Sequence, residues 1–472
     1  MQSADVGGKS GRAREARTLA EREAAGPPRG GEGVEDIFGL SRAAVPSVGG
    51  GRAVILDTVV VGAGHAGLGI ASLLLKDGRS VVVLERGRIA ETWRSQRWDS
   101  FQVNTPNWMN ALPGDSPDDA AREGFYRRDE LVHAYERYAE RHALPVLVGL
   151  TVTSVERAAV GDGFLIRATS GAGEDQAWQA RTVVIASGIQ GKPKLPGFNR
   201  ELPRGIVELH SSRYRKASLL RDGAVVVVGS GQSGCQIAED LLAAGRPVCL
   251  CASRVGRVPR RYRGRDILEW WAAMGTWEQR VDDLDDPSVR YAPQPQVSGV
   301  GRHGHTVSLQ QLARAGVRLL GRALGVNEGV LQLDSRLGEY IRFGDEKSAT
   351  FKKEVDDYVQ RAGTAAPPPE EDPADAPAPE LWSVTGPASL DLREAGIGTV
   401  IWCTGFTGDF GWIRLPVLDA RGLPVHEEGV SAAPGLYFLG FPWLRNRKSG
   451  IIYGIADDAA HIADAIARRL AG

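Results

Sequence analysis

A glycine-rich stretch at residues 62–67 has the spacing that a nucleotide pyrophosphate requires. Gly62 permits a tight turn after an apolar run, Gly64 lets the backbone approach a phosphate, and Gly67 allows the next helix to pack closely. Glu85 follows the next apolar run, where a carboxylate accepts hydrogen bonds from ribose hydroxyls. The pattern therefore predicts a dinucleotide site that prefers an unphosphorylated ribose, as in FAD.

The same motif occurs a second time further along the chain. Gly229, Gly231 and Gly234 repeat the spacing, and Ser233 lies between the last two glycines. An apolar run precedes this motif, and a helical pattern and a second apolar run follow it, as in the first copy. A chance glycine-rich turn would lack these flanking elements, so we expect two nucleotide-binding sites in one chain.

The second motif lacks the acidic residue that follows the first. The corresponding apolar run ends in the sequence CASR, which contains Ser253 and Arg254. A carboxylate here would repel a 2′-phosphate, whereas serine and arginine can bind one. Arg257, Arg260 and Arg261 are expected to add positive charge nearby. The sequence thus favours NADPH over NADH at this site, although Arg254 as an ordinary solvated charge stays an alternative.

The elements that must position these residues follow from the apolar pattern. Continuous apolar runs at 59–61 and 81–84 are typical of buried parallel strands, and the residues between them recur at helical spacing. A last helix is expected from about 454 to 470. The sequence therefore predicts an α/β fold with two dinucleotide-binding (Rossmann-like) domains, in which the FAD domain is discontinuous and the NADPH domain is inserted.

The expected domain organisation divides the chain into five segments. They are a disordered tail at 1–52, the first part of the FAD domain at 53–200, the NADPH domain with a helical insertion at 201–345, a helix and Pro-rich linker at 346–384, and the second part of the FAD domain at 385–472. Within them, residues 264–280 are expected to be helical, residues 364–380 to form an exposed linker, and residues 445–448 to form a solvated basic loop.

Composition excludes several classes of protein. The 57 basic and 58 acidic residues give a net charge of −1, which argues against a general nucleic-acid binder. No apolar run approaches the roughly 18 residues that span a bilayer, and a cytoplasmic location is the default expectation. The four cysteines are too few and too poorly spaced for a disulfide scaffold or zinc ribbon, and we expect no metal site. The oligomeric state has no signal in the sequence.

Further motifs resemble those of the class B flavin monooxygenases, which include the flavin-containing monooxygenases, the YUCCA-type enzymes and a bacterial branch. The sequence ETWR, with Trp93, resembles the Gly-Gly-x-Trp region that lies over the flavin. WCTGF, with Thr404 and Gly405, resembles their Ala-Thr-Gly motif. The segment from His210 to Tyr214 resembles the linker between their two domains. The resemblance covers nearly all of residues 53–472.

The resemblance implies FAD, NADPH, O₂ and a small organic substrate. In this family NADPH reduces FAD, and the reduced flavin reacts with O₂ to a C4a-hydroperoxide that transfers one oxygen atom. Asn104 resembles the asparagine that the family places beside the reacting flavin carbon, and an amide can donate and accept without being a proton source. Asn104 as a simple turn residue before Thr-Pro is an equal alternative. The last helix would point its positive end at the reduced flavin.

Departures from the family pattern leave alternatives open. Gly205 lies one residue too far from His210 for the Baeyer–Villiger signature, and Tyr214 stands in place of its tryptophan. This favours N-, S- or C-hydroxylation over ketone oxidation. Gly398 stands where the N-hydroxylating families carry an acid. A reductase or oxidase that passes electrons to a quinone or protein acceptor, and a non-enzymatic cofactor sensor, are the other hypotheses.

Overall fold

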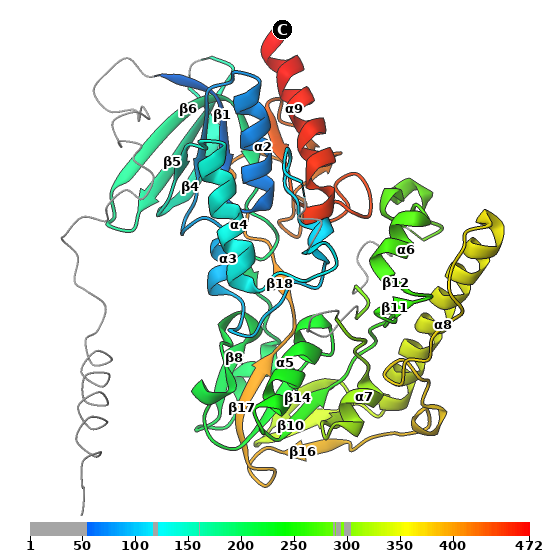
Figure 1. The fold of residues 1–472 in the computed structure, drawn as a ribbon. Helices are drawn as coiled ribbons and strands as arrows, with labels where there is room; N and C mark the ends of the chain where they lie inside the picture. Colours follow the sequence, from blue (N-terminus) through cyan, green and yellow to red (C-terminus); the bar gives the residue numbers. More distant parts are fainter. Residues whose placement is uncertain (1–53, 117–120, 160, 287, 289–293, 297–303) are drawn as a thin grey trace, which may run out of the picture. The chain divides into compact units, whose positions relative to one another are not determined.

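The structure is a computed structural model (Figure 1). It describes residues 54–472 apart from 117–120, 160, 287, 289–293 and 297–303. The tail expected at 1–52 lies outside the described residues. The helices are α2 (His65–Lys76), α3 (Glu91–Ser95), α4 (Arg128–Arg141), α5 (Gln232–Ala243), α6 (Ile267–Ala273), α7 (Leu309–Arg314), α8 (Leu337–Ala362) and α9 (Ile455–Ala471).

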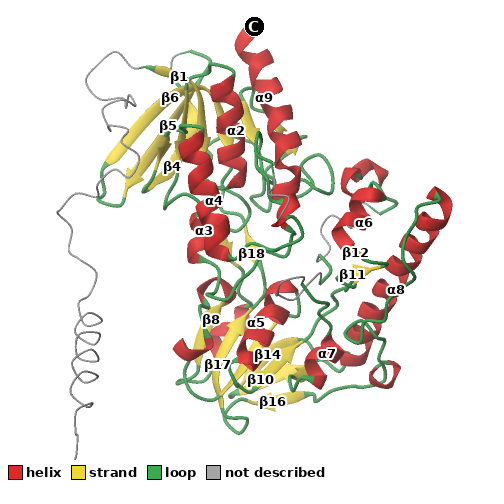
Figure 2. Ribbon diagram, viewed as in Figure 1, coloured by secondary structure: helices red, strands yellow, loops and turns green. Residues whose placement is uncertain are grey.

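The first glycine-rich motif belongs to a nine-stranded sheet. Its strands are β1 (Ile55–Val61), β2 (Val81–Leu84), β3 (Val146–Leu147), β4 (Leu150–Arg157), β5 (Phe164–Ser170), β6 (Asp175–Ile185), β19 (His426–Glu427), β20 (Val430–Ser431) and β21 (Leu436–Phe438). The central order β21-β6-β1-β2-β3 is parallel, whereas β4 and β5 extend β6 as an antiparallel meander. Helices α2 and α9 pack against each other along this sheet (Figure 2).

The second motif belongs to a separate sheet of five parallel strands in the order β13-β10-β9-β17-β8. These strands are β8 (Val207–His210), β9 (Ala224–Val228), β10 (Val248–Cys251), β13 (Arg318–Leu320) and β17 (Ile397–Trp402). Nearly all residues of β9, β10 and β17 are buried, as expected for strands covered on both faces. A mixed sheet with a parallel centre and an all-parallel sheet, each with its own glycine-rich turn, confirm the predicted α/β fold.

Small antiparallel units complete the described structure. They are the pairs β7 (Lys192–Pro193) with β18 (Phe406–Thr407) and β11 (Arg261–Tyr262) with β12 (Arg265–Asp266), and the three-stranded β14 (Ala323–Asn327), β15 (Val330–Leu333) and β16 (Ser389–Asp391). The expected helix at 264–280 is shorter than predicted, because it divides into α6 and a 3₁₀ turn at Thr276–Glu278 around Gly275, whose φ is +73°.

Two predicted boundaries differ from the structure. Strand β17 lies after residue 385 but pairs with β8 and β9 of the second sheet, so the return to the first sheet comes later than predicted. The pairing explains this, because a fully buried strand needs ladder partners on both sides. Helix α8 also begins at Leu337, before the predicted boundary at 346. The remaining boundaries stay a prediction.

Candidate functional site

The turn between β1 and α2 leaves space beside its middle glycine. Gly62 has a φ of +108°, and a Cβ there would lie 2.7 Å from the carbonyl oxygen of Ala186. A Cβ on Gly67 would lie 1.8 Å from the carbonyl oxygen of Gly62, so only glycine allows this packing. A Cβ on Gly64 would meet no atom of the described residues within 4 Å. Gly64 is the N-cap residue of α2, so the first N–H groups of this helix begin next to it, as a pyrophosphate site requires.

Glu85 directly follows β2 and is fixed by the backbone around the same turn. Its Oε2 accepts a hydrogen bond from the Ala63 N–H at 2.8 Å, and its Oε1 accepts one from the Gly87 N–H at 2.9 Å. Burial raises the pKa of Glu85, and the two backbone donors oppose this rise. The carboxylate is thus held beside the position where the adenosine ribose of a dinucleotide lies in this motif.

The turn between β9 and α5 reproduces the first one closely. Gly229 has a φ of +109°, and a Cβ there would lie 2.5 Å from the carbonyl oxygen of Cys403. A Cβ on Gly234 would lie 1.8 Å from the carbonyl oxygen of Gly229, whereas one on Gly231 would meet no described atom within 4 Å. Ser233 is half-buried in the first turn of α5. Both predicted motifs therefore have the shape of phosphate cradles.

The end of β10 is tied to the second cradle. The hydroxyl of the fully buried Ser230 accepts a hydrogen bond from the Ser253 N–H at 3.0 Å. Arg254 is exposed, and its guanidinium carbon lies 3.9 Å from the ring centroid of Phe343 in α8. No acidic side chain among the described residues forms an ion pair with Arg254. Its charge is therefore available to an anion at the edge of the cradle.

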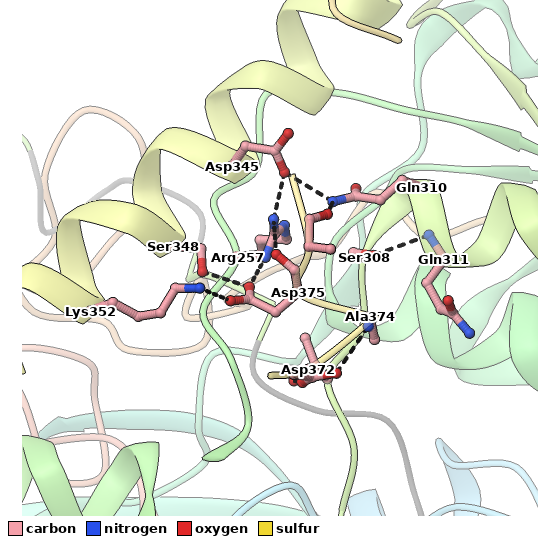
Figure 3. Close-up of polar contacts among 12 residues, drawn as sticks. Arg257, Ser308, Gln310, Gln311, Asp345, Ser348, Lys352, Asp372, Ala374 and Asp375 are labelled. Atoms are coloured by element: carbon pink, nitrogen blue, oxygen red, sulfur yellow. Dashed lines mark hydrogen bonds and ion pairs between the residues drawn. The ribbon is translucent and has the colours of Figure 1, made fainter. Parts of the chain in front are cut away.

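Arg257 does not add free positive charge to this site, contrary to the prediction. It is 2% exposed and forms ion pairs with Asp345 at 2.5 Å and with Asp375 (Figure 3). Lys352 contacts Asp375 at 2.5 Å, and Gln310 donates to Asp345 at 2.9 Å. Asp375 belongs to the Pro-rich segment, which was predicted to be an exposed linker. The buried charges instead fix that segment on α8.

Arg260 is also unavailable, because its guanidinium is buried and paired. Its Nε donates to the Asp266 carboxylate at 2.8 Å, and its Nη1 donates to the carbonyl oxygen of Asn104 at 2.8 Å. Arg261 lies 3.7 Å from the carboxylate of Glu123. The predicted positive charge of these arginines is thus largely neutralised. Arg260 instead connects the segment after the second motif to the loop that carries Asn104.

The side chain of Asn104 takes no part in the turn that surrounds it. Asn110 holds that turn, since its amide donates to the carbonyl oxygens of Thr105 at 3.0 Å and Pro106 at 3.1 Å. Asn104 is half-buried, and its amide has no hydrogen-bond partner among the described residues. The surrounding turn therefore does not depend on the Asn104 amide, and the role of this amide in the oxygen chemistry stays a prediction.

Trp93 lies in α3, half-buried beside an arginine that sequence reasoning missed. The guanidinium carbon of Arg97 lies 5.0 Å from the Trp93 ring and 5.5 Å from the Phe101 ring. Its Nη2 donates to the Gln190 side chain at 2.9 Å. Burial lowers the pKa of Arg97 to about 10. Trp93 and Phe101 each lie four residues from Arg97, but Gln190 lies 93 residues away, so no local motif contains the whole environment of Arg97.

The predicted WCTGF motif forms a turn after β17. The Thr404 hydroxyl donates to the carbonyl oxygen of Lys194. The carbonyl oxygen of Gly405 accepts from the Lys194 N–H at 3.0 Å and from His210 Nε2 at 2.9 Å. Nδ1 of His210 accepts from the Ser212 N–H at 3.2 Å, which leaves Nε2 as the donor. Burial lowers the pKa of His210, so this neutral histidine holds the turn in place.

The basic loop before α9 is only partly solvated, contrary to the prediction, because Arg445 and Arg447 are half-buried and Lys448 is buried. Lys448 is 7% exposed and contacts Glu278 at 2.6 Å and Asp457 at 2.5 Å. Asp458, in the first turn of α9, is fully buried and accepts a hydrogen bond from the Ser449 hydroxyl at 3.2 Å. Burial raises the pKa of Asp458 to about 6.

The described part of the chain contains the four cysteines and other possible metal ligands. Cys235, Cys249 and Cys251 are buried, Cys403 is half-buried, and all four are free thiols. Burial raises the pKa of each. Across the described residues, no group of three or more His, Cys, Asp or Glu could hold a metal ion. None of the described helices is long and apolar enough to cross a membrane.

Comparisons with known proteins match these features. Residues 59–272 match a family described as pyridine nucleotide-disulphide oxidoreductase. An uncharacterized CzcO-like oxidoreductase of Geobacillus kaustophilus is 28% identical over 87% of this chain and 98% of its own length. The indole-3-pyruvate monooxygenase YUCCA1 of Oryza sativa subsp. japonica is 29% identical over 46% of this chain and 53% of its own length.

Solved structures share the fold at low sequence identity. A flavin-containing monooxygenase from Stenotrophomonas maltophilia matches with a TM-score of 0.55 and 18% identity, over 88% of this chain and 99% of that chain. A bacillithiol disulfide reductase from Bacillus cereus matches with a TM-score of 0.57 and 15% identity, over 88% of this chain and 100% of that chain. The fold therefore occurs both in an oxygenase and in a disulfide reductase.

Proposed function

Because this chain belongs to the class B flavin monooxygenase family, we propose that it is an NADPH-dependent FAD monooxygenase that acts on a small organic substrate. The substrate, O₂, NADPH and one proton give the oxygenated substrate, NADP⁺ and water. Bound FAD would supply the electron transfer and the activation of O₂. The protein residues bind the nucleotides, exclude water and position the reacting groups.

The contrast between the two cradles carries this proposal. Each has an open middle glycine, Gly64 or Gly231, and therefore accepts a pyrophosphate. At the first cradle, Glu85 presents a fixed carboxylate, which suits ribose hydroxyls and repels a 2′-phosphate. At the second, Arg254 presents a guanidinium without an acidic partner among the described residues. FAD thus fits the first cradle and NADPH the second.

The residues near the expected oxygen chemistry suit a dry, positioned site. The amide of Asn104 can donate and accept a hydrogen bond without releasing a proton, and Arg260 fixes the backbone at that residue. Close by in sequence, Trp108 packs edge to face on Tyr453 with ring centroids 5.3 Å apart, and Trp277 lies 6.1 Å from Tyr453. These rings belong to one apolar cluster, and an apolar cluster beside the reacting groups would exclude water and protect a reactive oxygen donor.

The contacts of His210 and Tyr214, in the segment that resembles the family's interdomain linker, favour hydroxylation over ketone oxidation. His210, which would carry the Baeyer–Villiger signature, is committed to the carbonyl oxygen of Gly405. Tyr214 is fully buried, and its hydroxyl donates to Asp240. Both residues therefore act as fixed structural contacts. This favours oxygen transfer to nitrogen, sulfur or carbon.

Disulfide reduction, which the shared fold would also allow, has no support from the thiols. Cys235 and Cys251 are fully buried, and burial raises the pKa of both. Burial raises the pKa of Cys403 to about 12, so little thiolate forms near neutral pH. A redox-active cysteine needs surroundings that lower the pKa of its thiol and leave it accessible.

The test measures where the electrons and oxygen atoms go. The purified FAD-loaded protein is given NADPH and ¹⁸O₂ with a panel of amines and thioethers. NADPH consumption, hydrogen peroxide and product mass are recorded together. We expect at least one substrate to raise NADPH consumption, to lower the peroxide yield and to gain one ¹⁸O atom. Complete conversion of O₂ to peroxide with every substrate, together with rapid electron transfer to a quinone, would instead indicate a reductase.

A further inference from the structure

We infer that helix α8 forms part of the 2′-phosphate site, with Phe343 positioning Arg254 and Lys347 supplying a second positive charge. This inference rests on the proposed use of NADPH and names the residues that select it. Sequence reasoning placed the selection at the end of β10 alone. The structure adds a helix that lies far from that strand in the sequence.

The segment after β10 lies along one face of α8. Phe343 and Lys347 are four residues apart in this helix and therefore share a face. The Arg254 guanidinium carbon is 3.9 Å from the centroid of the Phe343 ring, and the Lys347 ammonium is 5.7 Å from the same centroid. A Cβ on Gly256 would lie 3.3 Å from Cγ of Lys347, so the lysine stem packs against this segment. Both cations thus contact the same aromatic ring.

These two cations differ from their neighbours because neither forms an ion pair with any described residue. On the same helix, Arg342 lies 3.7 Å from Glu346, Lys352 lies 2.5 Å from Asp375, and Lys353 lies 2.6 Å from Asp357. Two positive charges that share one ring and have no carboxylate partner among the described residues favour binding of an anion. A phosphate monoester carries about −1.5 to −2 charge near neutral pH and accepts several hydrogen bonds. Arginine can bind it through two donors, and lysine as a point charge.

The position of this pair fits the far end of a nucleotide bound in the second cradle. Strands β9 and β10 are parallel, with Val228 opposite Cys251, so the segment that follows β10 starts at the cradle edge. The hydrogen bond from the Ser253 N–H to the Ser230 hydroxyl fixes this start. In this motif the adenosine ribose lies beside the end of the second strand. Arg254 is the third residue after Cys251, with which β10 ends, and so belongs to this region.

The buried ion pairs of α8 hold the second half of this site in place. Asp345 and Lys352 flank Lys347 in the helix, and both contact the buried cluster around Arg257 and Asp375 (Figure 3). Arg257 lies only three residues beyond Arg254. The cluster therefore joins the segment after β10 to α8 and sets the spacing between the two cations. The ion-pair cluster around Arg257 and Asp375, which the sequence did not predict, thus helps to preform the proposed nucleotide site.

The experiment compares the affinities of the FAD-loaded, full-length protein for NADP⁺ and NAD⁺ at several salt concentrations. In Lys347→Gln we expect the Kd for NADP⁺ to rise about tenfold, the Kd for NAD⁺ to stay within twofold, and the salt dependence for NADP⁺ to become shallower. Lys353→Gln removes an exposed lysine of the same helix that has its own carboxylate partner, and it should leave both values unchanged.

A second pair of variants tests the positioning role of the ring. Phe343→Leu should weaken NADP⁺ binding several-fold, and Phe343→Tyr, which keeps an aromatic face for the guanidinium, should restore it. If the wild type prefers NADP⁺ but Lys347→Gln changes both nucleotides equally or neither, the inference is wrong while the proposed NADPH preference stands. If the wild type binds NAD⁺ as tightly as NADP⁺, the proposed cofactor preference itself is wrong.

Discussion

The substitution Gly231→Ala separates the stability of the second cradle from its function. Gly231 has φ and ψ of −72° and −175°, which any residue adopts, and a Cβ there meets no described atom within 4 Å. Alanine therefore fits the folded chain without strain. Because alanine has fewer unfolded conformations than glycine, the free energy of unfolding should rise by about 0.4–1 kcal/mol.

The same methyl group should damage nucleotide binding, because it occupies the space through which a phosphate approaches the backbone. Loss of one or two hydrogen bonds to a charged group, at about 1.5–3 kcal/mol each, corresponds to a Kd for NADPH raised roughly 100-fold or more. FAD content should be unchanged, since the first cradle is a separate turn. The mirror substitution Gly64→Ala should reduce FAD binding in a chain that stays folded.

The assay combines urea unfolding with titration of NADPH into the FAD-loaded protein. Gly234→Ala is the matched control, because its Cβ would lie 1.8 Å from the carbonyl oxygen of Gly229 and must disrupt the turn. We expect stability and affinity to change in opposite directions in Gly231→Ala, and to fall together in Gly234→Ala. Wild-type NADPH affinity in Gly231→Ala, or a loss of stability like that of Gly234→Ala, would refute the reasoning.

Three further predictions concern the active site and the buried charges. Asn104→Ala should raise the hydrogen peroxide released per NADPH several-fold with little change in FAD content; an unchanged peroxide yield would remove Asn104 from the oxygen chemistry. Asp375→Asn takes the counter-charge from Arg257 and Lys352 and should cost about 3–5 kcal/mol in urea unfolding; a loss below 1 kcal/mol would contradict the buried pairing. The folded pKa of Asp458, about 6, lies above its ordinary 3.8, so wild-type stability should fall as pH rises between those values. Asp458→Asn should remove that fall, which amounts to roughly 2–3 kcal/mol, and equal pH profiles of the two proteins would disprove the assignment.

Local sequence was sufficient to predict the two cradles. Gly67 packs on the carbonyl oxygen of Gly62 within the same turn, and Gly62 packs on Ala186 after the paired strand β6, so the structure shows the close contacts that the motif predicts. The helix that follows, and the carboxylate of Glu85 at the end of the second strand, belong to the same short unit. Such units can be recognised because few other sequences satisfy all of their backbone requirements.

The charges around the second cradle could not be predicted in the same way. Arg257 lies 88 residues from Asp345 and 118 residues from Asp375, so its partners follow from the fold and not from a local pattern. A basic run in the sequence therefore overstated the free positive charge. Phe343 and Lys347 lack a motif for the same reason, since they lie near Arg254 only after α8 has packed on the segment after β10.

The boundary at residue 385 was misplaced because strand order is a property of the sheet. The apolar run of β17 fits a buried strand in either sheet, and only the pairing with β8 and β9 assigns it to the second. Gly405 lies in the turn after β17, and its carbonyl oxygen accepts a hydrogen bond from His210 at the end of β8. This contact therefore joins the ends of the two paired strands. Register of this kind depends on tertiary packing.

The most direct test of the central claim is the rate at which each reduced nicotinamide nucleotide reduces the bound FAD without oxygen. The two cradles with opposite charges predict that NADPH, at equal subsaturating concentration, bleaches the flavin absorbance at least tenfold faster than NADH. Equal rates with both nucleotides, or a flavin that neither can reduce, would contradict the account.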